Sequence, residues 1–509
     1  MRAAVLIGFV LSTLMVIGVL SNDKKFVCYY GSWAVYRNGK GAFSVDNIDP
    51  FLCTHLIYSF VGLNVNGTIR VLDPWNDLEE NWGRGAMKQF NNLKRYNPKL
   101  RTLVAIGGWN EGSMVYSGVA KNSALRSRLA RDAADFCLTH GFDGFDLDWE
   151  YPGQRDGDPS VDRENFSLLL AEMREEFDKK GLLLTAAVAS TQTSASISYN
   201  IPEVAKFVDF INVMAYDLHG PWEPLTGHNA PLLPGPHDIS PLQYELNVEA
   251  VVRFWLQSGA PAEKLVLGLP LYGRSFTLRF DNNHTIGAAT SGPGQGGQYS
   301  YEAGFLGYNE VCEKLMFSKW NRCWDDDQKV PYAYSGNQWV GYDDEESLTL
   351  KVDLIKQYGL AGAMVWSIET DDFHGSCGEK NVLLNTIARE LELVPPPPTP
   401  STTTEGSTQT TTTTPDSTTT TSSTATPTTT VESTQTATTT TPGSTSSTTI
   451  DPQQCPGIGY FRDAHDCSKF YYCDGTTRFE FRCAIGLYFD ETILACNWAH
   501  LVDCKPLTD

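Results

Sequence analysis

The chain has 509 residues, is 41% hydrophobic and carries a formal net charge of −21. It is long enough for several domains and apolar enough for a large core. The acidic excess argues against a nucleic-acid partner, since phosphate contacts need clustered Lys and Arg, and a neutral or weakly charged substrate fits better.

The N-terminal segment has the features of a secretory signal peptide. Met1 and Arg2 precede an apolar run, and the small residue Ser21 stands before a cleavage position at Asn22. We therefore expect a signal peptide over residues 1–21. The alternative is a membrane anchor, because residues 3–20 are about long enough to span a bilayer. No other stretch is as long and apolar, so we expect a secreted, extracellular protein with no membrane contact after cleavage.

The cysteines and the glycosylation sequons agree with an oxidising compartment. The chain has 12 cysteines, divided evenly between the long first part and the last segment. Three Asn-x-Ser/Thr sequons make Asn66, Asn165 and Asn283 candidate N-glycosylation sites. Each sequon alone is weak evidence, and the prediction of secretion rests on their sum.

Short apolar runs alternate with amphipathic stretches through the first part of the chain. Eight runs predict strands, at residues 26–33, 55–63, 102–109, 144–151, 182–190, 207–217, 265–273 and 362–370. Between several of them lie helical patterns such as 123–141 and 164–181. This alternation predicts an α/β fold with a parallel sheet, most economically closed as a (β/α)8 TIM barrel over residues 22–394.

The interval between the seventh and eighth predicted strands is too long for one helix. From about residue 275 to 341 it is rich in Gly, Tyr and short strand-like pieces. We therefore predict a small inserted α+β domain between strands 7 and 8.

The composition changes abruptly after Val394. Residues 395–453 begin with four prolines, and from Thr399 onward they are almost entirely Thr and Ser. Such a tract cannot bury enough surface to fold and is typical of an O-glycosylated linker. Residues 454–505 hold six cysteines in a segment too small for an adequate core, which predicts a small disulfide-rich β module.

The fourth predicted strand carries acids at every second position. In FDGFDLDWEYP (142–152), Asp146, Asp148 and Glu150 share one face because side chains alternate along a strand. We expect this face to point into the barrel, whereas Asp143 has the opposite parity and is expected to tether the loop. Close carboxylates cannot all ionise at low cost, so at least one pKa should be raised, as a general acid at Glu150 needs.

The acidic face has two alternative interpretations. The spacing fits the oxygen ligands of a divalent metal, but the glycine pattern of a calcium loop is missing. A purely structural acid cluster is the second alternative. The nine histidines show no metal-binding spacing, and no phosphate-binding glycine motif or Gly-x-Ser-x-Gly elbow occurs, so we expect no metal and no cofactor.

The segment FDGFDLDWEYP resembles the signature Asp-x-x-Asp-x-Asp-x-Glu of the family 18 glycoside hydrolases, the chitinases. The resemblance extends from about Asp23 to Val394. It includes the motifs AIGGW (105–109), MAYD (214–217), LYGRSF (271–276) and MVWSIETDD (364–372). Ala105 stands where many members have Ser, a position that is not catalytic.

The resemblance implies a substrate-assisted, retaining hydrolysis of the β-1,4 bonds of chitin. Glu150 would act as general acid and then as base, Asp148 would orient the acetamido group, Asp146 would hold a proton deeper in the barrel, and Tyr216 would bind the acetamido oxygen. Other residues would bind substrate along the cleft: Trp33, Trp75, Gly108, Trp109, Tyr151, Met214, Asp217, Trp222, Tyr272, Arg274 and Trp366, with Glu302 a weaker candidate.

The segment DCSKFYYC, followed by GLYFDE and two more cysteines, resembles the peritrophin-type chitin-binding domain (peritrophin-A, family 14). Sequence alone leaves fifteen pairings of its cysteines open. Similarity implies the three pairs Cys455–Cys473, Cys467–Cys504 and Cys483–Cys496. Aromatic side chains also fill small cores, and three of them are candidate sugar platforms: Tyr471, Tyr472 and Trp498.

Cysteines of the first part of the chain are also expected to form disulfides. The family usually joins the pair that stands here as Cys28–Cys53, and we also expect Cys312–Cys377. Cys137 and Cys323 either remain free or pair with each other.

Both resemblances point to chitin and its N-acetylglucosamine oligomers as the partners of a secreted, endo-acting chitinase, expected to be a monomer. Three alternatives were weighed: an inactive chitin-binding lectin, a matrix protein that binds chitin through its tail alone, and an endo-β-N-acetylglucosaminidase acting on N-glycans. The intact acidic face, which includes Glu150, argues against the first, the intact set of cleft residues argues against the second, and the chitin-binding tail argues against the third.

Overall fold

The computed structural model describes residues 24–394 except 237 and 239. It also describes residues 459–504 except 464, 474–477, 484–486, 491–494, 500, 501 and 503. The expected signal peptide, the whole of the expected linker and Cys455 lie outside the described residues. The chain divides into two compact units, Met1–Thr403 and Thr404–Asp509. Within the described parts, no helix combines the length and the hydropathy needed to cross a membrane.

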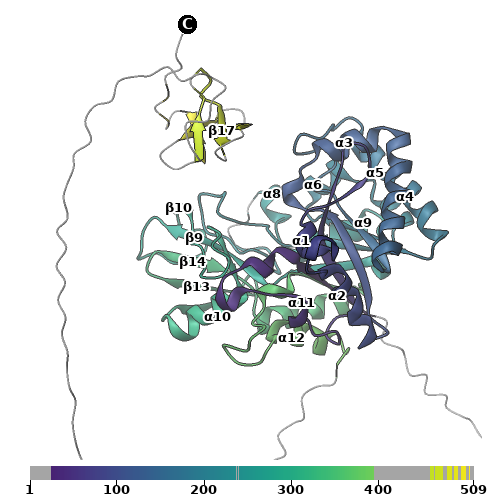
Figure 1. Ribbon diagram of the computed structural model, residues 1–509. Helices are drawn as coiled ribbons and strands as arrows, with labels where there is room; N and C mark the ends of the chain where they lie inside the picture. Colours follow the sequence, from purple (N-terminus) through teal and green to yellow (C-terminus); the bar gives the residue numbers. More distant parts are fainter. Residues whose placement is uncertain are drawn as a thin grey trace, which may run out of the picture. The chain divides into compact units, whose positions relative to one another are not determined.

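Eight parallel strands close into a barrel in the first unit, which confirms the predicted (β/α)8 fold (Figure 1). Around the barrel these strands follow chain order, and the last pairs with both its predecessor and the first. They are β1 (Lys25–Gly31), β2 (His55–Leu63), β4 (Arg101–Gly107), β5 (Gly144–Asp148), β6 (Leu183–Ala189), β7 (Phe210–Met214), β8 (Leu265–Pro270) and β15 (Gly362–Trp366). The short strand β3 (Ile69–Val71) pairs antiparallel with β2.

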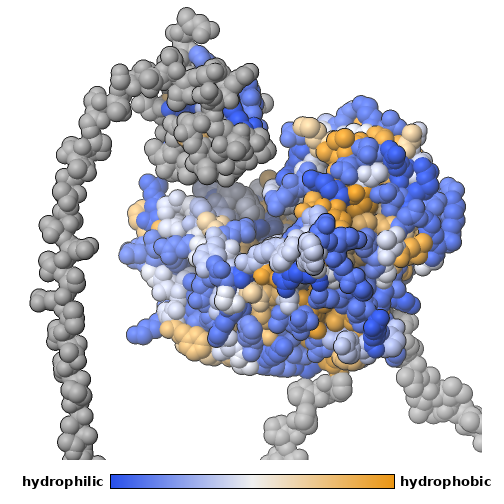
Figure 2. Space-filling view, in the orientation of Figure 1, coloured by the Kyte–Doolittle hydropathy of each residue, from blue (hydrophilic) through white to orange (hydrophobic). Residues whose placement is uncertain are grey.

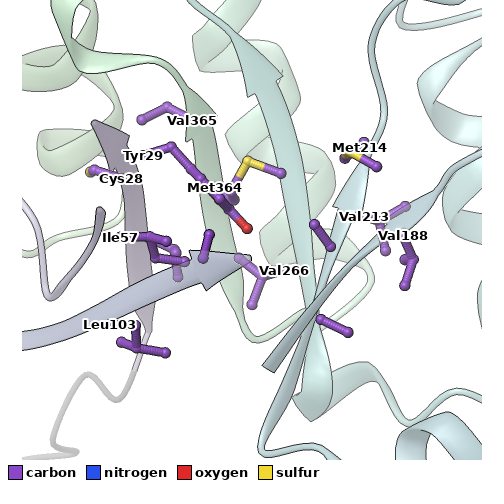
Figure 3. Close-up of a cluster of buried hydrophobic side chains, with 14 of the residues drawn as sticks. Cys28, Tyr29, Ile57, Leu103, Val188, Val213, Met214, Val266, Met364 and Val365 are labelled. Atoms are coloured by element: carbon purple, nitrogen blue, oxygen red, sulfur yellow. The ribbon is translucent and has the colours of Figure 1, made fainter. Parts of the chain in front are cut away.

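The barrel strands are almost continuously apolar because both of their faces are covered. Figure 3 shows side chains from several strands gathered in the core. Five that are at most 1% exposed come from five different strands: Tyr29, Ile57, Leu103, Val266 and Met364.

Helices connect the barrel strands. They are α1 (Pro74–Asp77), α2 (Ala86–Asn92), α3 (Met114–Lys121), α4 (Ser123–His140), α5 (Asp162–Asp178), α6 (Gln192–Ser198), α7 (Ile201–Phe207), α8 (Pro241–Tyr244), α9 (Val248–Gln257), α11 (Glu345–Gln357) and α12 (Val382–Glu390). The helix α4 ends where predicted, at Gly141 with φ 82°. The last helical residue of α5 is Asp178, and the expected glycine stop follows it: Gly181 has φ 65°, and the Leu182 N–H donates to the Phe177 carbonyl.

A second, antiparallel sheet stands between β8 and β15, beside the barrel (Figure 1). It consists of β9 (Tyr272–Leu278), β10 (Thr290–Pro293), β11 (Phe305–Gly307), β12 (Asn321–Asp325), β13 (Val330–Ser335) and β14 (Gln338–Gly341), with α10 (Tyr308–Phe317) between β11 and β12. It begins at Tyr272, slightly earlier than the expected residue 275, because the chain leaves the barrel directly after Pro270.

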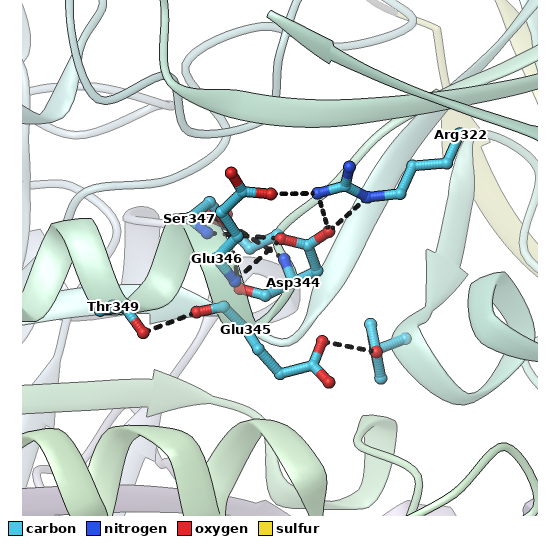
Figure 4. Close-up of polar contacts among 8 residues, drawn as sticks. Arg322, Asp344, Glu345, Glu346, Ser347 and Thr349 are labelled. Atoms are coloured by element: carbon cyan, nitrogen blue, oxygen red, sulfur yellow. Dashed lines mark hydrogen bonds and ion pairs between the residues drawn. The ribbon is translucent and has the colours of Figure 1, made fainter.

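The chain returns from this sheet to the barrel through a polar junction at the start of α11 (Figure 4). The Asp344 carboxylate caps α11 by accepting hydrogen bonds from the N–H groups of Glu346 and Ser347. Arg322 of β12 pairs with both Asp344 and Glu346 at 2.8 Å. The junction therefore fixes the edge of the inserted sheet to a barrel helix.

The second unit contains two small sheets. One is formed by β16 (Gly459–Arg462), β17 (Lys469–Cys473) and β18 (Arg478–Arg482), and the other by β19 (Leu487–Asp490) and β20 (Ala495–Trp498). The rings of Phe470 and Phe489 stack with centroids 4.3 Å apart, and Phe489 is fully buried. A disulfide joins Cys467 to Cys504, so this small core is stapled.

Candidate active site

Polar and aromatic side chains gather where the barrel strands end. Because the strands are parallel, their carboxyl ends meet at one end of the barrel. Met214 and Trp366 are the last residues of β7 and β15. Glu150 follows β5 by two residues, and Tyr272 follows β8 by two. The motifs found in the sequence therefore share one end of the barrel.

Asp146 lies at the bottom of the acidic face and is fully buried. Its carboxylate accepts hydrogen bonds from the Tyr29 hydroxyl at 2.6 Å, the Thr185 hydroxyl and the Asn212 amide at 3.2 Å. Burial raises its pKa, whereas these donors act in the opposite direction. The inward direction expected from strand parity agrees with these contacts, which come from β1, β6 and β7.

Asp148 and Glu150 lie closer to the carboxyl end of the barrel than Asp146. Burial disfavours the charged form of both carboxyl groups. Burial, Glu150 and Asp146 raise the pKa of Asp148 well above its ordinary value. Its Oδ1 atom is buried and has no hydrogen-bond partner. Burial raises the pKa of Glu150 to about 7, while a hydrogen bond from Tyr151 and the charge of Arg155 lower it. The pair therefore holds a proton near neutral pH, with Glu150 partly exposed at the barrel end.

The opposite face of β5 packs under the helices, as strand parity predicts. Trp149 is buried against the rings of Tyr116 and Phe166, and its indole N–H donates to the Ser113 hydroxyl. Asp143, before the strand, forms an ion pair with Lys94 at 2.9 Å. Asp143, which is not part of the acidic face, therefore tethers the loop before β5 to Lys94, as expected.

The paired glycines of the AIGGW motif allow the backbone to pass close to Asp148 of the acidic face. A Cβ atom at Gly107 would lie 2.0 Å from the Asp148 carbonyl oxygen, and Gly107 has φ 118°. The Gly108 N–H donates to the same carbonyl, and a Cβ there would meet the Phe60 ring at 2.6 Å. Neither position accepts a larger residue without moving β5 or the ring.

The residues of MAYD and LYGRSF form one cluster. Asp217 receives hydrogen bonds from the Tyr272 hydroxyl at 2.7 Å and from two nitrogens of Arg274 at 2.7 and 2.8 Å. The Tyr216 ring lies 6.1 Å from the Tyr272 ring. Burial raises the Tyr216 pKa well above its ordinary value, so its hydroxyl keeps its proton. The inserted domain thus supplies two side chains that hold Asp217.

A group of rings occupies the side of the barrel end formed by β15, β1 and β2. Trp366 lies 5.6 Å from both Tyr29 and Phe60 and 6.1 Å from Trp33, measured between ring centroids. Trp33 also stacks on Phe60, and 42% of its surface is exposed. These rings offer partly open flat faces.

Three further tryptophans expected in the cleft are more than half exposed: Trp75, Trp109 and Trp222. Each has a neighbouring cation, which lies over the ring: Arg84 at 5.8 Å, Arg155 at 3.6 Å and Arg274 at 5.5 Å, respectively. Glu302 is also exposed. In the view of Figure 2, the surface of the first unit is mostly hydrophilic, with separate apolar patches.

Several residues at the site carry no motif and were missed. Thr185 pairs with Asp146 across the β5–β6 ladder, and Asn212 has the same inward parity on β7. Parity on neighbouring strands could have indicated both. Arg155, whose guanidinium donates to the carbonyls of Trp109 and Glu150, had no such signal because it lies in a loop.

The structure joins Cys28 to Cys53 and Cys312 to Cys377, the pairs expected in the first part. Cys137 and Cys323 are free thiols. In the second unit the joined pair Cys467–Cys504 is also an expected one, and Cys483 is disulfide-bonded. The side chains of Cys473 and Cys496 lie outside the described residues, as does Cys455.

Among the described residues, one group of Cys, His, Asp or Glu side chains is close enough to hold a metal ion, namely Cys312, Asp372 and Cys377. Because its two sulfur atoms form a disulfide, it offers no thiolate ligand.

The three sequons differ in their surroundings. Asn66 and Asn283 lie in exposed turns, where each side-chain oxygen accepts a hydrogen bond from the Thr two residues later. Asn165 lies inside α5, its Nδ2 atom is buried, and Ser167 of its sequon is 4% exposed. A glycan on this nitrogen does not fit the folded helix, so the expectation for Asn165 is at odds with the structure.

Of the three candidate platforms in the second unit, the side chain of Tyr471 alone is described. Its ring stacks on Phe461, and Arg478 lies 3.9 Å above it. The side chains of Tyr472 and Trp498 lie outside the described residues.

Comparison with known proteins identifies two families in this chain. Residues 25–371 match glycosyl hydrolases family 18, and residues 455–504 match the chitin binding Peritrophin-A domain. "Probable chitinase 2" of Drosophila melanogaster is 44% identical over 369 residues, 70% of this chain and 74% of that protein. "Endochitinase" of Manduca sexta is 39% identical over 391 residues, 74% of this chain and 70% of that protein.

A solved structure is similar over the same range. The Group IV chitinase of Ostrinia furnacalis, in complex with allosamidin, has a TM-score of 0.71 and 48% sequence identity. The match covers 72% of this chain and 99% of that one. The chain belongs to glycosyl hydrolases family 18 and carries a Peritrophin-A domain at its C-terminal end.

Proposed function

We propose that the protein is an endochitinase, which hydrolyses β-1,4 bonds between N-acetylglucosamine units by substrate-assisted, retaining acid catalysis. The observation that carries this proposal is the graded acidic face of β5. Its members run from the fully bonded Asp146 to the partly exposed Glu150, whose pKa is raised to about 7 by burial. A carboxylic acid that keeps its proton near neutral pH is what cleavage of a glycosidic bond needs.

Glu150 donates its proton to the glycosidic oxygen as the bond breaks. The acetamido oxygen of the sugar whose glycosidic bond breaks attacks the anomeric carbon of that same sugar, and an oxazolinium ion forms. Asp148 accepts the acetamido N–H at its Oδ1 atom, which is buried and otherwise without a partner. The Tyr216 hydroxyl donates a hydrogen bond to the acetamido oxygen. Water then attacks the anomeric carbon while Glu150 takes its proton. The bond between the anomeric carbon and the acetamido oxygen breaks, so that the oxazolinium ring opens and the configuration is retained.

Asp146 stabilises the arrangement of the acidic face. Three donors hold its carboxylate, so it stabilises a proton shared between Asp148 and Glu150 without leaving its place. Asp217, fixed by Tyr272 and Arg274, contacts the sugar at the point of cleavage.

The sugar rings stack on exposed aromatic faces along the barrel end, formed by Trp33, Trp75, Trp109, Trp222 and Trp366, beside Gly108, Tyr151 and Met214. The C-terminal module binds chitin and, through the linker, raises the local concentration of the barrel at the insoluble substrate. The protein is secreted and acts as a monomer.

Hydrolysis of a fluorogenic chitin oligomer tests the proposal. The full-length protein should cleave it, and Glu150→Gln should lose about 10²–10⁴-fold in rate while it still binds colloidal chitin. Binding without cleavage by the unaltered protein would identify a lectin instead. Release of N-glycans without cleavage of chitin would identify an endo-β-N-acetylglucosaminidase.

A further inference from the structure

Two turns at the barrel end each present one exposed or half-exposed indole ring. The turn after β1, η1 (Ser32–Tyr36), carries Trp33, and the turn after β15, η8 (Ile368–Thr370), is separated from Trp366 by Ser367 alone. The centroids of the two indole rings lie 6.1 Å apart, and the Phe60 ring is stacked with each of them, at 6.0 Å from Trp33 and 5.6 Å from Trp366. Their mutual position depends on what fixes one turn to the other.

The Glu369 carboxylate lies between these turns and has no exposed surface. Its Oε2 atom accepts a hydrogen bond from the Gly31 N–H at 3.1 Å, and its Oε1 atom accepts one from the Ser367 hydroxyl at 2.6 Å. Arg37 donates to the Glu369 backbone carbonyl at 3.1 Å and lies 3.8 Å from Oε1. Burial raises the pKa of Glu369, and Arg37 acts against this rise.

These contacts hold both ends of η1. Gly31 is the residue before the turn, and Arg37 is the residue after it. The fit around the carboxylate is close, since a Cβ atom at Gly31 would lie 2.6 Å from Glu369 Oε1 and 2.9 Å from the Trp33 ring. A shift of the carboxylate would therefore move the turn that carries Trp33.

We propose that Glu369 is a positioning residue for sugar binding, which fixes the Trp33 ring against Trp366 by holding both ends of η1. The inference rests on the proposed function, because Trp33 matters only if it stacks on substrate. Glu369 itself has no path to the sugar, since it is buried beneath the turn. Its effect on affinity must pass through Trp33.

The buried carboxylate suits this role better than an amide would. A carboxylate is acceptor-only, and here it accepts from two donors on different segments while facing a guanidinium. A glutamine would have one acceptor oxygen and would bring two unwanted protons toward the Gly31 N–H or Ser367. Glu369→Gln thus changes the geometry of η1 with almost no change in volume.

A double-mutant cycle tests the inference, because only residues that act together depart from additivity. Affinity for chitin hexamer is measured by calorimetry in full-length protein carrying Glu150→Gln. On this parent, Glu369→Gln and Trp33→Ala should each weaken binding by roughly fivefold to tenfold, as the loss of one buried hydrogen bond or ring contact does. With both changes, binding should be no more than about twofold weaker than with Trp33→Ala alone.

The matched control is Asp371→Asn, two residues further along the same segment. Asp371 is also fully buried, but it accepts from the N–H groups of Leu383 and Leu384 at the start of α12. This change should lower the melting temperature and leave the affinity within twofold of the parent. Should Glu369→Gln fail to fold, Arg37→Gln removes the hold on the far end of η1 and should weaken binding by about threefold, again only when Trp33 is present.

Three results would overturn the inference: unchanged affinity in Glu369→Gln, unchanged affinity in Trp33→Ala, or fully additive losses. All three leave the proposed function intact if the unaltered protein hydrolyses chitin oligomers. If the parent does not bind the hexamer and the unaltered protein does not hydrolyse it, the proposed function fails and this inference with it.

Discussion

Asp146 and Asp148 on β5, and Glu150 two residues after its end, are three acids with three different surroundings. Three donors satisfy Asp146, one oxygen of Asp148 has no partner, and Glu150 lies beside Tyr151 and Arg155. Burial is the largest cause of the raised pKa at all three. The three acids differ in how far their neighbours offset the cost of burying a charge. This difference determines which of the three carboxyl groups holds the proton that catalysis needs.

The first prediction concerns pH. Glu150 must be protonated to start the reaction, and its pKa is raised to about 7, so kcat/KM should fall as the pH rises through about 7. Because the charge of Arg155 lowers this pKa, Arg155→Gln should move the alkaline limb to higher pH. The pH dependence of kcat/KM for a soluble oligomer measures both effects.

The matched control for this prediction is Lys206→Gln, which removes an exposed cation on α7 and should leave the limb in place. A limb that stays fixed in Arg155→Gln, or moves to lower pH, would contradict the assignment of that limb to Glu150.

The second prediction concerns glycosylation. Asn66 and Asn283 should carry N-glycans on the secreted protein, whereas Asn165 should not, because its Nδ2 atom is buried within α5. Mass spectrometry of peptides after enzymatic deglycosylation in ¹⁸O water distinguishes the three. A glycan at Asn165 would show that α5 or its packing differs from the structure.

At the scale of elements, strand parity was the most informative property of the sequence. It correctly placed the acids of β5 on one face and Trp149 on the other. It did not indicate how the strands close around Asp146, because the contact with Tyr29 joins residues 117 positions apart. Loop residues such as Arg155 were not predictable, since no periodicity governs them.

Some of the backbone geometry at the barrel end could not be predicted from the sequence either. The cis peptide bonds at Ser59–Phe60, Glu150–Tyr151 and Trp366–Ser367 involve no proline, and no local pattern announces them. The paired glycines were visible in the sequence, but the reason for them, the approach of Gly107 to the Asp148 carbonyl, depends on the neighbouring strand.

The third prediction concerns the junction between the inserted sheet and α11. Asp344→Ala removes the cap of α11 and should lower the free energy of unfolding by about 1–2 kcal/mol. Glu346→Ala removes only a solvent-exposed partner of Arg322 and should cost less than about 0.5 kcal/mol. Chemical denaturation of both variants tests this, and equal losses would contradict the capping role.

At the scale of the whole molecule, the composition of the chain predicts where its parts meet. The alternation of strands and helices predicted the barrel, and the excess length before the eighth strand predicted the inserted sheet. The start of that sheet was placed late, because LVLGLPLYG reads as one apolar strand although the chain leaves the barrel after Pro270. Cysteine spacing indicated the stapled module but could not select among its pairings.

The fourth prediction concerns the division of labour between the two units. A chain ending at Val394 retains every described residue of the barrel end. It should hydrolyse soluble oligomers at the full-length rate and act at least severalfold more slowly on insoluble chitin, where tethering raises the local concentration. Assays on both substrates measure this. An equal loss on both would mean that the module supports the barrel itself.

The measurement that tests the central claim most directly is time-resolved NMR of the products formed from chitin hexamer. Substrate-assisted catalysis with Glu150 as general acid predicts shorter oligomers whose new reducing ends are first in the β-anomeric form and only later mutarotate. Products released first as α-anomers, or no release of product between acidic and neutral pH, would contradict the account.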